Sequence, residues 1–160
     1  MRSSRPGSFS TVDFEDLYQE IILDHYRHPR NAARLDHIPE EAVHENPTCG
    51  DSIKLELKIS PDGTLESVRF DGRGCAISTA SASMMTEHIR GRDLGEAENR
   101  VEEFLTIMRG ERPTEDLGSW GELEALKGVI RYPVRLKCAT LAWYALKHGI
   151  AAHQMSHRGP

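Results

Sequence analysis

The sequence is short of features that mark two common classes of cysteine-containing protein. Only three of its 160 residues are cysteines, at positions 49, 75 and 138, and no two of them form a C-x-x-C pair. Small secreted proteins held by disulfides carry denser cysteines in even numbers, and ordinary zinc fingers use C-x-x-C pairs. Neither class fits this chain, so we expect a cytoplasmic protein with reduced thiols.

Long hydrophobic runs and blocks of positive charge are also missing. No apolar run approaches the roughly 18 residues of a membrane helix, and the opening MRSSRPGSFS lacks the apolar stretch of a secretory signal. Lys and Arg number 20 against 25 Asp and Glu, which gives a formal net charge of −5. An acidic chain without a basic block binds nucleic acid poorly. We therefore expect neither a membrane nor a nucleic acid as partner.

The remaining composition suits one folded domain. Hydrophobic residues make up 38% of the chain and charged residues 28%, which is enough apolar material for one core. A length of 160 residues also fits a single domain. We predict a flexible lead over residues 1–10, a domain over 11–150 and a frayed tail over 151–160.

Two strands are predicted from alternating apolar and polar residues. The stretch IKLELKI, residues 53–59, alternates without a break, and LESVRF, residues 65–70, places Val68 and Phe70 on one face. The connection SPDG between them contains Asp62-Gly63 and is short enough for a tight turn. These features predict an antiparallel hairpin.

Helical spacing of apolar residues predicts four helices. They cover residues 10–28, 71–91, 95–110 and 133–150. In the first helix Leu17, Ile21 and Tyr26 are the spaced apolar residues, and Pro29 is expected to end it. Gly149 is expected to end the last helix.

Two further features belong to the helical half of the chain. The third helix places Ala97, Val101, Phe104, Leu105 and Met108 on one side. Residues 111–132 are mixed in character and are expected to hold a short helix around 122–127.

One turn carries unusual chemistry. In NPTCGDS, residues 46–52, Cys49 and Asp51 flank a glycine just before the first strand. Cys75 follows the second strand at the start of a helix, and Cys138 lies in the first turns of the last helix. Loops converge at strand edges and helix N-termini, so these four side chains could gather around one zinc ion. Spacing alone leaves buried structural cysteines as an open alternative.

Four stretches of the chain occur in a characteristic order. They are LDHYRHPRN (23–31), NPTCGDSIKLEL (46–57), DGRGCAISTASASMM (71–85) and RLKCATLAW (135–143). Together they resemble the IscU/SufU (NifU N-terminal-like) family, whose members serve iron–sulfur cluster assembly.

The resemblance implies a fold and a metal site. The fold is α/β (α+β) and SufE/NifU-like, with a small three-stranded, mainly antiparallel sheet and helices packed on one side. The third strand is expected in residues 37–45, where pattern alone indicates a loop. The site is one metal ion held by Cys49, Asp51, Cys75 and Cys138.

Two features point to the SufU-type branch of this family. IscU-type scaffold members carry a histidine directly before the third cysteine, whereas this chain has Lys137, whose charged form cannot bind a metal. Residues 111–132 resemble an insertion found in SufU-type members. The resemblance then implies a zinc-dependent sulfurtransferase. It would take persulfide sulfur from a SufS-type cysteine desulfurase and serve downstream components of the SUF system.

Accepting sulfur requires a nucleophilic thiolate. A thiol is mostly protonated at neutral pH, whereas a zinc-bound thiol is deprotonated but less nucleophilic, so one ligand must leave the metal. We assign that role to Cys49, because Gly50 gives its backbone freedom while Cys75 and Cys138 lie near helices. Arg135 is assigned a catalytic role, in which its positive charge stabilises the thiolate. The alternative is that Arg135 is a solvated arginine without a catalytic role.

Two other functions stay open from the sequence. The same ligands suit a scaffold that holds a [2Fe–2S] cluster, although Lys137 argues against it. The chain could also be a non-catalytic module in which zinc only stabilises an interaction surface. For His25 and His28 we favour a surface or helix-end role over a partner contact.

Overall fold

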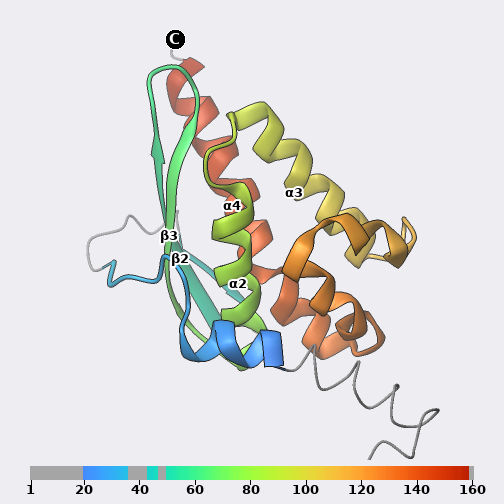
Figure 1. Ribbon diagram of the computed structural model, residues 1–160. Helices are drawn as coiled ribbons and strands as arrows, with labels where there is room; N and C mark the ends of the chain where they lie inside the picture. Colours follow the sequence, from blue (N-terminus) through green and yellow to red (C-terminus); the bar gives the residue numbers. More distant parts are fainter. Residues whose placement is uncertain (1–19, 36–42, 47–49, 159–160) are drawn as a thin grey trace, which may run out of the picture.

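The structure is a computed structural model, and it describes residues 20–35, 43–46 and 50–158. The described residues form a small sheet with helices packed against one of its sides, as Figure 1 shows. The predicted lead over residues 1–10 lies outside the described ranges, as does Cys49. The α/β (α+β) class implied by the sequence is confirmed by the described part of the chain.

Three antiparallel strands make up the sheet. They are β1 (Val43–Asn46), β2 (Asp51–Ile59) and β3 (Leu65–Arg73), in the order β1-β2-β3. The predicted hairpin between β2 and β3 is confirmed. Gly63 in its turn has a φ of 89°, a conformation that glycine adopts without strain.

The buried face of the hairpin follows the predicted alternation. Ile53 and Leu55 of β2 are buried, and so are Val68 and Phe70 of β3. Leu55 lies opposite Phe70 in the antiparallel register. These side chains form the sheet's contribution to the hydrophobic core.

Two α-helices, α2 (Ala76–Ile89) and α4 (Pro133–Arg158), cover this face. Helix α3 (Leu94–Met108) packs against α4 on the side away from the sheet (Figure 1). The five apolar residues predicted on one side of α3 are all buried. In the core between the helices, Trp143 stacks on Phe104 with 3.9 Å between ring centroids.

Helices α2 and α4 pack closely because α2 carries small side chains. Ala80, Ser81 and Ala82 are fully buried. The Ser81 hydroxyl donates to the Ala139 carbonyl at 2.6 Å and accepts the indole N–H of Trp143 at 3.0 Å. These two hydrogen bonds join the two helices across the core.

Helix α4 is longer than the sequence analysis predicted. Gly149 does not end it, and residues 151–158, which we expected in a frayed tail, continue the helix to Arg158. A Cβ atom at position 149 would lie 3.1 Å from Leu57 Cδ1. The glycine therefore serves the close approach of α4 to β2, and its interpretation as a helix stop is wrong.

The first helix is described from residue 20 and is helical over residues 20–27. It ends two residues before Pro29, as predicted. Its buried residues are Ile22 and His25, whereas Tyr26 is 45% exposed. Tyr26, one of the three apolar residues at helical spacing, therefore does not belong to the buried face.

The mixed segment before α4 forms two 3₁₀ helices, η2 (Thr114–Ser119) and η3 (Gly121–Arg131). The expected helix around 122–127 lies inside η3 but is shorter than it. Leu117, Trp120 and Leu126 are buried in the core. This segment is therefore part of the domain's packing.

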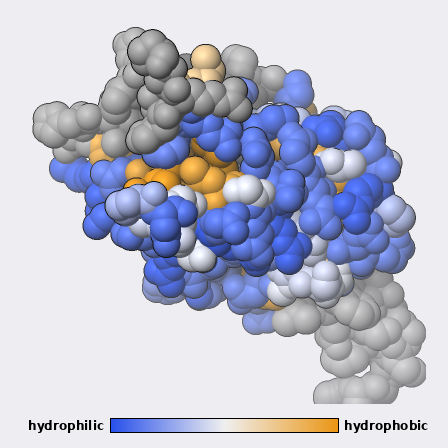
Figure 2. Space-filling view, turned by 90° about the horizontal axis from the view of Figure 1, so that it is seen from above, coloured by the Kyte–Doolittle hydropathy of each residue, from blue (hydrophilic) through white to orange (hydrophobic). Residues whose placement is uncertain are grey.

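The surface seen from above is mostly hydrophilic, with a hydrophobic area near the middle of the described part and smaller ones toward its edges (Figure 2). Within the described ranges, none of the helices combines the length and apolar character needed to cross a membrane.

Candidate metal centre

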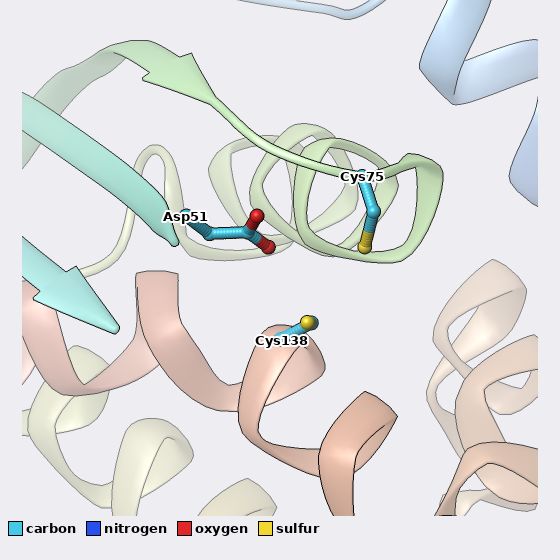
Figure 3. Close-up of side chains that lie close together, drawn as sticks. All are labelled: Asp51, Cys75 and Cys138. Atoms are coloured by element: carbon cyan, nitrogen blue, oxygen red, sulfur yellow. The ribbon is translucent and has the colours of Figure 1, made fainter. Parts of the chain in front are cut away.

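Three of the four predicted ligands come together at one end of the sheet. Asp51 begins β2, Cys75 directly precedes α2, and Cys138 lies in the second turn of α4. Their side chains point toward one another in Figure 3, and their ligand atoms all lie within 4.8 Å of one another. The fourth predicted ligand, Cys49, is outside the described residues.

The spacing of these atoms suits a tetrahedral ion. Thiolate and carboxylate ligands bind zinc at about 2.0–2.3 Å, which sets ligand atoms about 3.3–3.8 Å apart in a tetrahedron. The observed limit of 4.8 Å requires only a small inward movement. Two sulfurs and a carboxylate form a donor set of mixed softness that zinc accepts.

The carboxylate of Asp51 is incompletely paired. Asp51 is 5% exposed, and its Oδ2 atom is buried with no hydrogen-bond partner among the described residues. A buried oxygen without a partner costs free energy, and a charged one costs more. The centre is therefore incomplete without a further group, and a bound cation would offset the charge.

Two glycines shape the backbone around Asp51. Gly50 has a φ of 75°, so the C-G-D turn needs a residue that tolerates the left-handed region. A Cβ atom at Gly74 would lie 2.7 Å from Asp51 Cγ and 2.9 Å from Asp51 Oδ2. Because real Cβ atoms do not approach other atoms so closely, only glycine at position 74 allows the Asp51 carboxylate to keep its observed position.

Cys75 occupies the N-cap position of α2 in an extended conformation, with φ −78° and ψ 176°. No side-chain hydrogen bond caps this helix, and its first turn has no acidic residue. The positive end of a helix dipole favours negative charge at such a place. The local field at Cys75 therefore suits an anionic metal ligand.

Arg135 lies one turn before Cys138 on α4 and is exposed. The surface around it is partly apolar, since Tyr132 is 59% and Val134 is 54% exposed. Arg131 is exposed there too. A basic and apolar surface thus adjoins the clustered cysteines on a chain of net negative charge.

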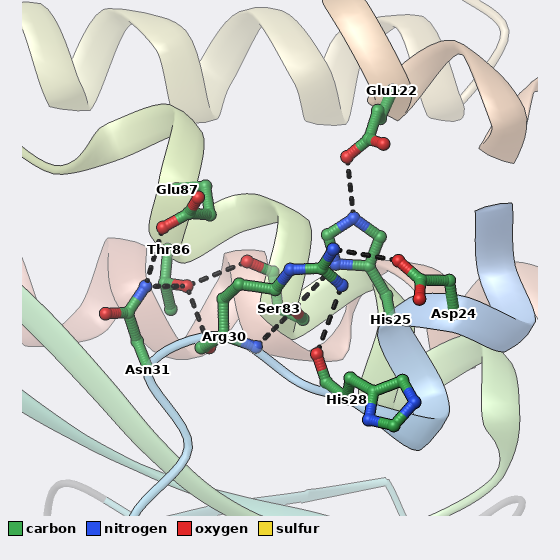
Figure 4. A network of polar contacts seen from close by, with 9 residues as sticks. All are labelled: Asp24, His25, His28, Arg30, Asn31, Ser83, Thr86, Glu87 and Glu122. Carbon is green, nitrogen blue, oxygen red and sulfur yellow. Dashed lines mark hydrogen bonds and ion pairs between the residues drawn. The ribbon is translucent and has the colours of Figure 1, made fainter.

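A buried histidine network was not anticipated from the sequence. His25 is 1% exposed, and Figure 4 shows it between α2 and η3. Its Nδ1 lies 2.7 Å from Ser83 Oγ, and its Nε2 lies 2.7 Å from Glu122 Oε1. We favoured a surface or helix-end role for His25: it does lie in the last turn of the helix over residues 20–27, but it is not on the surface. The signal was its position three residues after Ile22, which places both on one helical face.

The neighbouring polar groups in Figure 4 hold the chain that follows the first helix. The backbone N–H of Arg30 donates to Ser83 Oγ at 2.8 Å, and its guanidinium donates to Asp24 at 2.8 Å. This hydrogen bond lowers the pKa of the Asp24 carboxyl below its ordinary value. His28 is exposed, and its carbonyl accepts from Arg30 at 3.1 Å.

Comparison with known proteins places the chain in a family. The family model described as NifU-like N terminal domain matches residues 17–158. The chain is 43% identical over 144 residues to "Zinc-dependent sulfurtransferase SufU" of Bacillus subtilis (strain 168), covering 89% of this chain and 95% of the relative. It is also 43% identical over 136 residues to "Iron-sulfur cluster assembly scaffold protein IscU" of Streptococcus pyogenes serotype M1, covering 84% and 82%.

A solved structure agrees with this placement. It is that of a protein from Fervidobacterium islandicum AW-1, described as a candidate iron–sulfur cluster assembly scaffold for the SUF system. Its TM-score is 0.67 at 30% sequence identity, with 80% of this chain and 92% of that chain covered. The chain belongs to the NifU-like N-terminal domain family, and the family expected from the four motifs is confirmed.

Proposed function

We propose that this protein is a zinc-dependent sulfurtransferase that accepts persulfide sulfur from a cysteine desulfurase for iron–sulfur cluster assembly. The observation that carries the proposal is the convergence of Asp51, Cys75 and Cys138 within 4.8 Å. The B. subtilis relative, 43% identical over most of its length, is named a zinc-dependent sulfurtransferase and adds support.

The proposed ligands are Cys49, Asp51, Cys75 and Cys138. Cys49 is included from the motif, since it stands two residues before Asp51 in the C-G-D turn. Bound zinc would keep the ligand thiols deprotonated at neutral pH. Reduced thiols are a condition of this role, which fits the cytoplasmic location expected from the cysteine content.

In the proposed step Cys49 is the sulfur acceptor. Its thiolate leaves the ligand set and attacks the outer sulfur of the desulfurase persulfide. A new sulfur–sulfur bond forms on Cys49, the old one breaks, and the desulfurase cysteine departs as a thiolate. The left-handed Gly50 beside Cys49 supports this choice, because Cys75 and Cys138 are fixed at the starts of helices.

Arg135 is proposed to act at the same place. It is exposed one turn before Cys138, with Tyr132 and Val134 exposed nearby. A cation at the edge of an interface raises the association rate with a partner of opposite charge and can steady thiolate charge. We therefore assign this surface to the desulfurase, which must reach Cys49.

The test is persulfide transfer from a SufS-type desulfurase supplied with cysteine. Wild-type protein is expected to gain the mass of one sulfur on the peptide that contains Cys49 and to raise desulfurase turnover. Cys49→Ser is expected to lose both effects while Asp51, Cys75 and Cys138 remain. Normal transfer by this variant would refute the assignment of Cys49.

Arg135 is tested in the same assay with a matched pair of variants. Arg135→Ala is expected to lower the transfer rate roughly tenfold, and Arg135→Lys, which keeps the charge, is expected to lower it less. Equal transfer rates in wild type, Arg135→Ala and Arg135→Lys would show that Arg135 is a solvated residue without a role in transfer.

A scaffold function is the second candidate, because an IscU scaffold protein is also 43% identical to this chain. Cysteine ligation suits iron–sulfur clusters as well as zinc. Metal analysis separates the two functions: one zinc ion and a colourless sample support the sulfurtransferase, whereas a brown sample that contains sulfide supports the scaffold. An unchanged desulfurase turnover would instead favour a non-catalytic zinc module.

A further inference from the structure

Gly74, Ser78 and the carboxylate of Asp51 meet at one point beside the metal centre. The position that a Gly74 Cβ would occupy lies 2.2 Å from Ser78 Oγ and 2.9 Å from Asp51 Oδ2. The hydroxyl and the carboxylate oxygen therefore face the same small space, which is left open because residue 74 has no side chain.

The carboxylate oxygen in that space lacks a partner. Asp51 Oδ2 is buried and accepts no hydrogen bond within the described ranges. In a tetrahedral site a carboxylate gives one oxygen to the ion, and its second oxygen is then served by a neighbouring donor. Oδ2 is the oxygen that faces Ser78 and needs such a donor.

Ser78 carries the hydroxyl that lies nearest this space. It is the third residue of α2 and is 8% exposed. Its hydroxyl now donates to the Cys75 carbonyl at 3.1 Å, but that carbonyl also accepts the backbone N–H of Thr79 at 3.1 Å. Turning the hydroxyl toward Asp51 would leave the carbonyl paired.

We propose that Ser78 is a positioning residue for the metal centre, and that its hydroxyl donates to Asp51 Oδ2 when the other carboxylate oxygen binds the ion. Gly74 is the residue that makes room for this hydrogen bond. The proposal rests on the proposed metal site and adds to it a donor that fixes the orientation of the carboxylate.

The expected effect is on metal affinity. Loss of a hydrogen bond to a metal-binding side chain typically weakens metal binding by about 10–100-fold. Ser78→Ala is therefore expected to weaken zinc binding by about that factor. Its fold should persist, because alanine is the best helix former. Gly74→Ala is expected to weaken binding further, because its Cβ would overlap both groups.

The test measures zinc dissociation constants of the full chain by competition with a chromophoric chelator. Ser83→Ala is the matched control: it removes another buried hydroxyl of α2, one that contacts His25 and Arg30. Its zinc affinity is expected to stay within about twofold of wild type. Cobalt substitution gives a second readout, since its absorption bands report the geometry of the ligand set.

A double-mutant cycle decides whether Ser78 acts through Asp51. In an Asp51→Ala background, Ser78→Ala is expected to have no further effect on zinc affinity. An unchanged affinity of Ser78→Ala in the native background, or an equal loss in both backgrounds, would overturn the proposal. If Asp51→Ala itself leaves zinc affinity unchanged, the metal site fails, and that outcome is distinct from a failure of Ser78 alone.

Discussion

The first turn of α2 and its second half both lie beside buried polar side chains, yet those side chains differ in how they are paired. In the second half, Ser83 contacts His25 and accepts the N–H of Arg30, while Thr86 accepts from Asn31 and donates to the Ser83 carbonyl. At the first turn, Asp51 Oδ2 is buried with no partner among the described residues.

This difference separates a structural network from a functional one. A buried network whose members are paired within the chain fixes the packing of its elements, and its loss reduces stability alone. Asp51 Oδ2 accepts no hydrogen bond from the described residues, and we expect it to gain one from Ser78 only when the carboxylate binds an ion. The His25 network therefore serves the fold, and the cysteine end of the same helix serves the proposed chemistry.

Of the three tests of this comparison, removing the metal is expected to change the stability of the protein most. Saturation of a site by a ligand at a thousand times its dissociation constant adds about 4 kcal/mol to the free energy of unfolding. A strong chelator should therefore lower the melting temperature by about 10 °C. Scanning calorimetry with and without chelator measures this. Cys138→Ser is expected to have the lower melting temperature both with and without chelator. A wild-type melting temperature that does not change with chelator would contradict the proposed difference between the two regions.

Breaking the paired network is expected to have an intermediate effect. His25→Ala leaves Ser83 and Glu122 without their partner and opens a cavity, so it should lower the free energy of unfolding by about 2–3 kcal/mol. Urea unfolding of zinc-loaded protein measures this, with the exposed His28→Ala as a control expected within about 0.5 kcal/mol of wild type. Zinc content should stay at the wild-type value, and a loss of zinc in His25→Ala would break the separation of the two regions.

His88 gives the smallest expected effect and sharpens the comparison, since its buried Nε2 also lacks a partner among the described residues. Its ring stacks on Trp120, with 4.6 Å between centroids. Burial, and then the charges of Arg92 and Arg100, lowers the pKa of His88 from 6.5 to about 4. The unfolded chain therefore binds a proton that the folded protein does not between these pH values, and stability falls as the pH falls from about 6.5 to about 4.

The measurement is urea unfolding of wild type and His88→Gln at pH 7 and pH 4.5. Because His88 is only half-buried, solvent reduces the effect, and we expect wild type to lose about 1–2 kcal/mol more than the variant on acidification. Parallel losses in the two proteins would show that the His88 ring is protonated as easily in the folded state as in the unfolded state.

Local pattern predicted the parts of the fold that are decided locally. The alternation in β2, the Asp62-Gly63 turn and the apolar face of α3 all depend on neighbours in sequence, and each is confirmed. Gly149 was misjudged because its reason is Leu57, which is distant in sequence. The burial of His25 could have been predicted from its spacing to Ile22, but its partners could not, because Ser83 and Glu122 become its neighbours only in the folded chain.

The sequence indicated which residues form the candidate metal centre, but not how their surroundings hold them in place. The residue types and the four family motifs indicated Asp51, Cys75 and Cys138 as ligands, and the structure brings their ligand atoms together. The roles of Gly74 and Ser78 could not be found this way. They depend on how closely the chain before α2 approaches the start of β2, which no periodicity encodes.

The hydrogen bond from Ser81 to the Ala139 carbonyl has a consequence for the proposed metal site when no ion is bound. Ala139 follows Cys138 directly, and Ser81 lies on the helix that Cys75 begins. The two helices cannot part at this end without breaking that bond and the one from Trp143. A zinc-free chain should therefore keep the sulfurs of Cys75 and Cys138 in the same relative positions. Zinc should then bind again without any refolding of the chain, at a rate limited only by diffusion of the ion.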